Sequence, residues 1–401
     1  MSPPDSNAAL RWSAAPLALL LALGLLDQQV VAPLIAVIAA GLGVSVAEAG
    51  LAVSAYAVAA SAAALLIGPV SDARGRRPFL LAATALLAAA AGLVAGFPGY
   101  ASFLVARVGA GIAGGTIAAL AVAWVGDRVA YERRGRIMAL LLGAAMGAAI
   151  LGQVGAAFAS ARWGHQPVYA VLAAGAALTL VPLAMLREPR RRFDDRALRL
   201  RLAGYQAFFR SATLRRAALA AFCLSASLVG VSTYASGWLQ EFRGYTVAEV
   251  GLMYGGLGAA VLVVQPLAGP LADRFGKRRF TIATSVALAL VTVTLPLLPG
   301  WAALVGLLGF GVIGVARMGA FAALRSELAG PRRRAAFLAF SNTASQIGIA
   351  AAAAVGSILY GVGFQAVCWG MAGFGVLAVF LVSGIGPPEA DTPAAPGDAA
   401  A

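Results

Sequence analysis

The sequence has few of the residues on which most enzyme chemistry depends. It contains one histidine, two cysteines and 16 acidic residues in 401 positions. The isolated His165, Cys223 and Cys368 offer neither a metal-binding spacing nor a disulfide framework. The absence of a glycine-rich phosphate-binding loop argues against ATP as an energy source. We therefore expect no enzyme activity, no metal and no cofactor.

Charge is also scarce. Only 11% of the residues are charged, whereas a soluble domain carries about 25%. Hydrophobic residues make up 61% of the chain, and the mean hydropathy is +0.86. The net charge of +14 does not predict nucleic-acid binding, because the basic residues fall in short clusters between apolar runs rather than on one soluble surface.

Apolar runs long enough to cross a bilayer dominate the chain. A spanning helix needs about 20 mostly apolar residues, and loops, charges, proline and glycine divide the sequence into twelve such runs. The first run extends from Ala14 past Asp27 to about Ala40, which is too long for a signal peptide. We interpret it as a retained first helix.

A thirteen-residue cassette occurs twice, at 68–80 and 269–281, with the pattern Gly-Pro-x-x-Asp-x-x-Gly-basic-Arg. The 201-residue offset is half the chain, which indicates two copies of one membrane unit. Capping boxes at Ser45/Glu48 and Thr246/Glu249 precede equivalent helices. We predict an all-α membrane protein of twelve transmembrane helices in two pseudo-symmetric six-helix domains. The predicted segments are an N-terminal domain at 1–186, a basic linker at 187–216, a C-terminal domain at 217–386 and a disordered tail at 387–401.

The basic residues predict the orientation. The loops after the even-numbered helices 2 to 10 hold 25 of the 30 basic residues, so both termini and both cassettes are expected in the cytoplasm. The linker has ten arginines against three acids. It is either an amphipathic helix on anionic headgroups or a solvated connection. The Ala-, Gly- and Arg-rich composition suggests a bacterial inner membrane.

The cassette resembles the loop between helices 2 and 3 of the major facilitator superfamily of secondary transporters. Its glycines permit tight turns, and its carboxylates suit a helix N-terminus. The resemblance implies that Asp72 meets a helix start near Ala335, that Asp273 meets one near Ile137, and that Arg76 pairs with Asp127. Alternatively, these residues only orient and end helices. The predicted gating residues are Gly68, Asp72, Gly75, Arg76, Asp127, Gly269, Asp273, Gly276 and Lys277.

Asp27 lies near the middle of the first predicted helix, where a charge costs several kcal/mol and is a functional candidate. The segment 26–45 resembles the first helix of the twelve-helix drug:proton antiporters, in which an acid at this place takes part in proton coupling. Arg107, with Gly111 and Gly115, resembles the family motif of the fourth helix. The resemblance implies that Asp27 and Arg107 approach each other and couple protons to substrate. The alternatives are a neutral, hydrogen-bonded Asp27 or a structural ion pair.

Other polar residues at membrane depth are candidates for a substrate cavity. Arg317 has three open roles: binding an anionic substrate, binding a carbonyl or acid near the gate, or extending towards the cytoplasm. Many of the others are expected to be packing contacts. The predicted cavity residues are Gln28, Tyr56, Gln153, Ser232, Tyr234, Gln265, Arg317, Asn342 and Gln346, with Tyr254, Phe222 and Phe321 as further aromatic candidates.

The predicted function is secondary active transport, by proton-coupled export of a small organic amphipathic compound. In the fifth helix, Ala148 and Leu151 replace the proline and a glycine typical of the antiporters, which weakens that assignment. The alternatives are a proton-coupled uptake symporter of a sugar, amino acid or organic anion, a lipid exporter, or a non-transporting scaffold. We expect a monomer with a small-molecule substrate and the bilayer as its partners.

Overall fold

The computed structural model describes residues 6–129, 131–186, 208–330 and 334–386, so most of the predicted linker and the whole predicted tail lie outside the described residues. The elements are helices throughout the described part of the chain. They are α1 (Ser6–Gln29), α2 (Val31–Leu42), α3 (Val46–Arg74), α4 (Arg77–Gly96), α5 (Tyr100–Arg128), α6 (Tyr131–Trp163), α7 (Gln166–Met185), α9 (Ala212–Arg243), α10 (Val247–Phe275), α11 (Lys277–Thr294), η1 (Leu295–Leu297), α12 (Gly300–Leu328), α13 (Arg334–Val362) and α14 (Phe364–Ser383).

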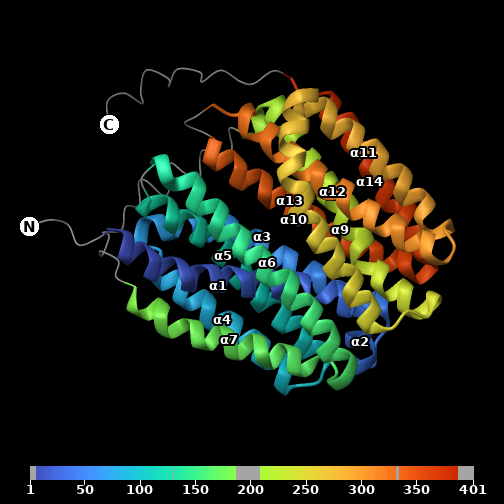
Figure 1. Cartoon of the computed structure of the whole chain (residues 1–401), viewed down its shortest axis with the longest axis horizontal. Helices are drawn as coiled ribbons and strands as arrows, with labels where there is room; N and C mark the ends of the chain where they lie inside the picture. Colours follow the sequence, from blue (N-terminus) through green and yellow to red (C-terminus); the bar gives the residue numbers. More distant parts are fainter. Residues whose placement is uncertain (1–5, 130, 187–207, 331–333, 387–401) are drawn as a thin grey trace, which may run out of the picture.

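These helices confirm the prediction of a polytopic membrane protein. Within the described residues, 11 helices are long and apolar enough to span a bilayer, and the bent pair α1 and α2 brings the number to 12. The helices of the first half, α1–α7, lie on one side of the molecule and those of the second half, α9–α14, on the other (Figure 1).

The first span is broken, where the sequence predicted one continuous helix. Its two pieces, α1 and α2, meet at an angle of 56° around Val30. The cause is Pro33, which has no N–H to donate to the carbonyl of Gln29 and whose ring crowds that carbonyl. The break therefore follows directly after Gln29, two residues beyond Asp27, and Pro33 cannot donate to the carbonyl of Gln29.

The predicted domain boundary at 217 falls inside a helix. Helix α9 starts at Ala212, with Ser211 as its N-cap, whereas the sequence placed the domain boundary at 217. The end of the linker also packs on protein. The Phe208 ring lies 5.7 Å from that of Phe337 in α13, and Phe208 is 2% exposed.

The two halves are joined at one end of the bundle. We call the end with the loops at Gly75 and Gly276 the cassette end, and the opposite end the far end. At the far end, hydroxyls on one half donate to main-chain carbonyls on the other. Ser54 donates to Ala350 at 2.7 Å, Ser357 donates to Ala47 at 2.7 Å, and Ser236 donates to Ala32.

The cassette end is open along α10. Of residues 265–276, all are exposed except Ala268 and Ala272, so this part of the helix has few neighbours on any side. The start of α1 and the end of α14 lie at this same end (Figure 1). The molecule is therefore closed at the far end and accessible from the cassette end.

Glycines set how closely the helices approach one another. A Cβ added at Gly111 of α5 would lie 2.3 Å from the Tyr56 carbonyl oxygen of α3, whereas one at Gly109 would lie 3.5 Å from the Ala90 side chain. A backbone carbonyl cannot move away from an added methyl group as easily as a side chain can. Overpacking of this kind costs about 1–3 kcal/mol of folding stability. We expect Gly111→Ala to lower the thermal midpoint of the purified protein by several degrees. The matched control Gly109→Ala, on the same helix, should change it little; equal midpoints for the two variants would contradict this packing.

Candidate substrate cavity and buried charge pair

A cavity of about 390 Å³ lies between the two halves. Its walls come from α1, α2, α3, α5 and α6 of the first half and from α9, α10, α12 and α13 of the second. The predicted cavity residues that line it are Gln28, Tyr56, Gln153, Ser232 and Gln265, together with Arg107 and Tyr254. The cavity is mostly apolar, and its one charged lining residue, Arg107, lies on the first half.

Asp27 and Arg107 form an ion pair beside the cavity, so the expected approach of these residues is present. Nη1 of Arg107 donates to Oδ2 of Asp27 at 2.9 Å and to the main-chain oxygen of Asp27 at 3.2 Å. Their side chains are 2% and 1% exposed. The ring of Tyr56 lies under the guanidinium, with its centroid 4.6 Å away.

The pair can link protonation to conformation. Two buried opposite charges are tolerated because each offsets the other, whereas removal of one leaves an uncompensated charge that costs about 3–5 kcal/mol. A proton on Asp27 removes its negative charge and leaves Arg107 as a buried cation. Arg107 lines the cavity, so a molecule bound there would lie next to the pair.

A second polar link joins the broken first span to α6. The side-chain nitrogen of Gln153 donates to the side-chain oxygen of Gln29 at 2.9 Å, and both residues line the cavity. Gln29 directly precedes the break at Val30. The sequence analysis named Gln153 as a cavity residue but missed its partner, although Gln29 is adjacent to the predicted Gln28.

Two predicted cavity residues lie elsewhere. Tyr234 is fully buried, and its hydroxyl donates to the Ala353 carbonyl at 2.6 Å. Its ring fits against Gly50 and Gly356, which places it in the closed far-end interface instead of the cavity. Arg317 is also fully buried and lies inside the second half.

The surroundings of Arg317 show what its side chain binds in this conformation. Its Nη2 donates to the Leu224 carbonyl at 2.7 Å and to the Ser227 hydroxyl at 3.1 Å, both on α9. A fully buried guanidinium neither reaches the cytoplasm nor touches a substrate in this conformation. Binding a carbonyl is the role that the geometry fits.

The remaining predictions for the cavity wall also need correction. Asn342 accepts a hydrogen bond from Nη1 of Arg325 at 3.3 Å, and neither it nor Gln346 lines the cavity described above. Of the four aromatic candidates, Tyr56 and Tyr254 line the cavity, whereas Phe222 and Phe321 do not. Phe321 is buried and lies under the guanidinium of Arg325, 5.2 Å from it.

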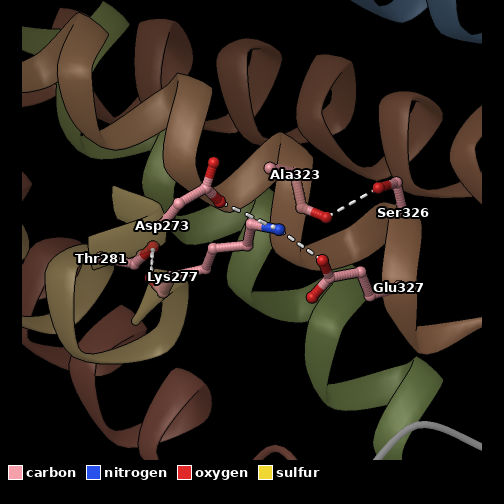
Figure 2. A network of polar contacts seen from close by, with 6 residues as sticks. All are labelled: Asp273, Lys277, Thr281, Ala323, Ser326 and Glu327. Atoms are coloured by element: carbon pink, nitrogen blue, oxygen red, sulfur yellow. Dashed lines mark hydrogen bonds and ion pairs between the residues drawn. The ribbon is translucent and has the colours of Figure 1, made fainter. Parts of the chain in front are cut away.

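The cassettes form one ion-pair cluster in each half. In the first half, Nε of Arg76 donates to Oδ2 of Asp127 at 2.9 Å and Nη2 donates to Oδ1 at 3.3 Å. In the second half, Lys277 points between two carboxylates (Figure 2). Its Nζ lies 3.2 Å from Asp273 and also pairs with Glu327. Each cluster ties the start of one helix to the end of another within the same half.

Glu327 is a site residue that the sequence analysis missed. Asp127 and Glu327 occupy the same position near the ends of two 29-residue helices, α5 and α12, so the half-chain repeat contained the signal. Gly75 and Gly276 have φ values of 95° and 84°, which confirms the expected tight turns.

The predicted contact of Asp273 with the start of the fifth span near Ile137 is not made in this conformation. The Asp273 side chain is 65% exposed and pairs with Lys277 in its own half. The open cassette end separates the halves at this point. The side chain of Asp72 and that of Ala335 lie outside what the structure describes.

His165, in the loop before α7, is buried at the far end. Its ring lies against Gly41 and meets Tyr169 edge to face, with 6.5 Å between the ring centroids. Burial lowers the pKa of His165 below its ordinary value, since the charged form loses its hydration. His165 does not line the cavity described above.

Comparison with known proteins identifies the family of this chain. The sequence profile of the Major Facilitator Superfamily matches residues 17–316 and 217–400, so the chain belongs to this family. No curated protein matches the sequence. Membership of this family identifies the protein as a multi-pass membrane protein and a secondary active transporter that works by alternating access, rather than an enzyme.

Solved structures share the fold at low identity. A D-xylose-proton symporter has a TM-score of 0.75 at 19% identity, over 94% of this chain and 98% of that one. The inward-open xylose transporter XylE from E. coli has a TM-score of 0.73 at 18% identity, over 94% and 97% of the two chains. A bacterial homologue of the human lysosomal transporter Spinster, inward-facing and occupied, has a TM-score of 0.78 at 16% identity, over 93% and 96%.

The ion pair predicts non-additive effects on stability. In Asp27→Leu the cation of Arg107 stays buried without its partner. In Arg107→Met the carboxylate of Asp27 stays buried without its partner. We therefore expect each single variant to lose about 3–5 kcal/mol of folding stability. In the double variant no charge remains, and the thermal midpoint should rise above that of both single variants. Midpoints of detergent-purified protein measure this. Simple addition of the two losses would show that the residues do not interact.

The burial of His165 should make the stability of the protein depend on pH. A histidine whose folded pKa lies below its unfolded value binds fewer protons in the folded state. Stability is therefore retained above about pH 6.5 and lost as the pH falls below that value. We expect His165→Gln to flatten the decrease in the thermal midpoint between pH 7 and pH 5. An unchanged slope would mean that other groups cause the decrease.

Proposed function

We propose that this protein exports a small amphipathic organic compound in exchange for protons, with Asp27 as the proton-accepting group. The observation that carries the proposal is the buried Asp27–Arg107 pair at the wall of a mostly apolar cavity. The proposal places the protein, as a monomer, in a bacterial inner membrane with its cassette end in the cytoplasm.

The positions of the basic residues support this orientation. The loops at the cassette end, including those at Arg76 and Lys277, carry most of the arginines and lysines, and such loops stay in the cytoplasm. With this orientation, closure of the far end by Ser54, Ser236 and Ser357 makes the present conformation inward-facing. The cavity is then ready to accept substrate from the cytoplasm.

The proposed cycle follows from the charge balance of the pair. A proton from outside neutralises Asp27, loosens its bond to Arg107 and favours the inward-facing state. Substrate enters from the cytoplasm, and its presence in the cavity favours the ionised pair and proton release. The halves then close at the cassette end, where Asp72 forms the contact with the opposite half expected of the outward-facing state, and the substrate leaves.

The cavity wall favours an amphipathic substrate over a sugar. A sugar needs hydrogen-bonding groups on all sides, whereas the second half presents mainly apolar side chains such as Leu257 and Leu307. Proton-coupled uptake is the second candidate, since a D-xylose-proton symporter shares the fold. Export and uptake differ in the direction of proton movement relative to substrate.

The test measures proton movement in proteoliposomes with an enclosed pH dye, over lipophilic cations, neutral drugs and organic anions. We expect some of these compounds to move protons in the opposite direction to themselves. Asp27→Asn should abolish this movement, because an amide cannot take up the proton, and Asp27→Glu should retain part of it.

Glu241→Gln is the matched control. Glu241 accepts a hydrogen bond from Tyr360 at 2.7 Å and is exposed, away from the cavity. It should move protons as the wild type does. Coupled proton movement that persists in Asp27→Asn would refute the coupling role of Asp27. Movement of protons and substrate in the same direction would establish the symport alternative.

A further inference from the structure

The two halves carry opposite chemistry at equivalent positions of the first and seventh spans. Helices α2 and α9 both end at a left-handed glycine, Gly43 with φ 66° and Gly244 with φ 73°. Asp27 and Leu228 both lie 16 residues before that glycine. The position that holds the buried carboxylate in the first half therefore holds a leucine in the second.

The same replacement occurs on two further helix pairs. Tyr56 and Leu257 both lie ten residues after the first residue of α3 and α10, which begin with identical capping geometry. Arg107 and Leu307 both lie seven residues after the first residue of α5 and α12, two helices of equal length. Three interacting polar residues of the first half thus correspond to three leucines of the second.

All three leucines line the same cavity as Tyr56 and Arg107. Two of them pack closely against glycines of α12, because a Cβ added at Gly311 would lie 2.0 Å from Leu257 and one at Gly314 would lie 2.4 Å from Leu228, and Leu307 is a residue of α12 itself. The leucines are therefore a fixed wall of the cavity. We call Leu228, Leu257 and Leu307 the leucine wall.

Hydroxyl groups beside the leucine wall are already occupied. Ser232 and Thr233 donate to the Val229 carbonyl of their own helix at 3.1 and 2.7 Å. The hydroxyl of Tyr254 donates to the Ser232 carbonyl at 2.5 Å. Apart from the amide of Gln265, a ligand on this side meets hydrocarbon and few free donors.

The first half offers the opposite surface. Gln28, Gln29 and Gln153 place side-chain amides on the cavity, and these both donate and accept hydrogen bonds. Arg107 is the one charged residue among those that line the cavity, and Asp27 neutralises it. A charged head group would be buried here without a counter-charge, which is costly, whereas a neutral amide or hydroxyl would be hydrogen-bonded.

We propose that the transported compound is an uncharged amphiphile that binds in one orientation, with its hydrogen-bonding head against the first half and its hydrocarbon tail against the leucine wall. This inference rests on the proposed function only in taking the cavity as the substrate site. The observation behind this proposal is the pseudo-symmetric alignment of the two halves. Equivalent backbone positions supply a polar side chain in the first half and an apolar side chain in the second.

The experiment measures equilibrium binding to the purified protein in lipid nanodiscs, without a proton gradient, by isothermal titration calorimetry. The ligands are hexanamide, octanamide and decanamide, with octylammonium and octanoate as charged ligands of matched length. We expect the amides to bind about fourfold more tightly for each added methylene, because each one is removed from water. Octanamide should bind more tightly than both charged ligands.

Variants assign the tail to the leucine wall. Leu257→Ser should weaken octanamide binding by about tenfold or more, and it should reduce the gain per methylene. The matched control is Leu252→Ser on the same helix, since Leu252 is 54% exposed and does not line the cavity. All variants are measured in the same bilayer, so ligand partition into lipid cancels between them. Leu257→Ala serves as a second variant if the serine variant does not fold.

Each result decides the proposal. It is overturned if no amide binds, if octylammonium or octanoate binds more tightly than octanamide, or if Leu257→Ser and Leu252→Ser give the same gain per methylene. Failure of the proposed antiport is separate, because the binding assay involves no proton movement. Amide binding that depends on the leucine wall, together with no proton movement in proteoliposomes, would retain this inference and refute the antiport.

Discussion

The buried bond between Asp27 and Arg107 is the constraint around which the cavity is organised. Neither charge is stable alone at this depth, so the two helices that carry them must hold their present distance while Asp27 is ionised. The break of the first span after Gln29 places the carboxylate and its main-chain oxygen where one guanidinium nitrogen reaches both. Under the function we propose, packing, proton uptake and substrate access therefore meet in one interaction, which would give alternating access a point of control.

The contacts elsewhere in the bundle divide into two kinds of different strength. Charge-assisted bonds, such as Arg76 to Asp127 and Lys277 to Glu327, lie within a half and make each half a rigid unit. Contacts between the halves, such as Ser54 to Ala350, join neutral hydroxyls to carbonyls, and such bonds in membranes are worth about 0.6 kcal/mol each. An interface made of weak bonds between rigid halves can open and close at small cost, which is the mechanical requirement of rocking transport.

Internal repetition explains how one sequence builds a symmetric scaffold and an asymmetric site. The repeated elements are backbone devices, namely the capping boxes at Ser45 and Thr246 and the cassette turns at Gly75 and Gly276. The side chains at the cavity have diverged, with Arg107 in one half and Leu307 in the other. Two copies of one fold thus supply a charged wall and an apolar wall without any change in helix arrangement.

The sequence by itself determined the spans, the repeat, the cassette turns and the Asp27–Arg107 candidate, because bilayer thickness, turn chemistry and the cost of buried charge act locally or on single residues. Only the tertiary structure decided which polar side chains face the cavity. Tyr234 and Arg317 are buried in packing contacts, and the leucine wall faces the ligand space. The reason is physical: a membrane helix is apolar on all sides, so its polarity pattern does not encode its rotation, which close packing around glycines such as Gly111 and Gly311 sets instead.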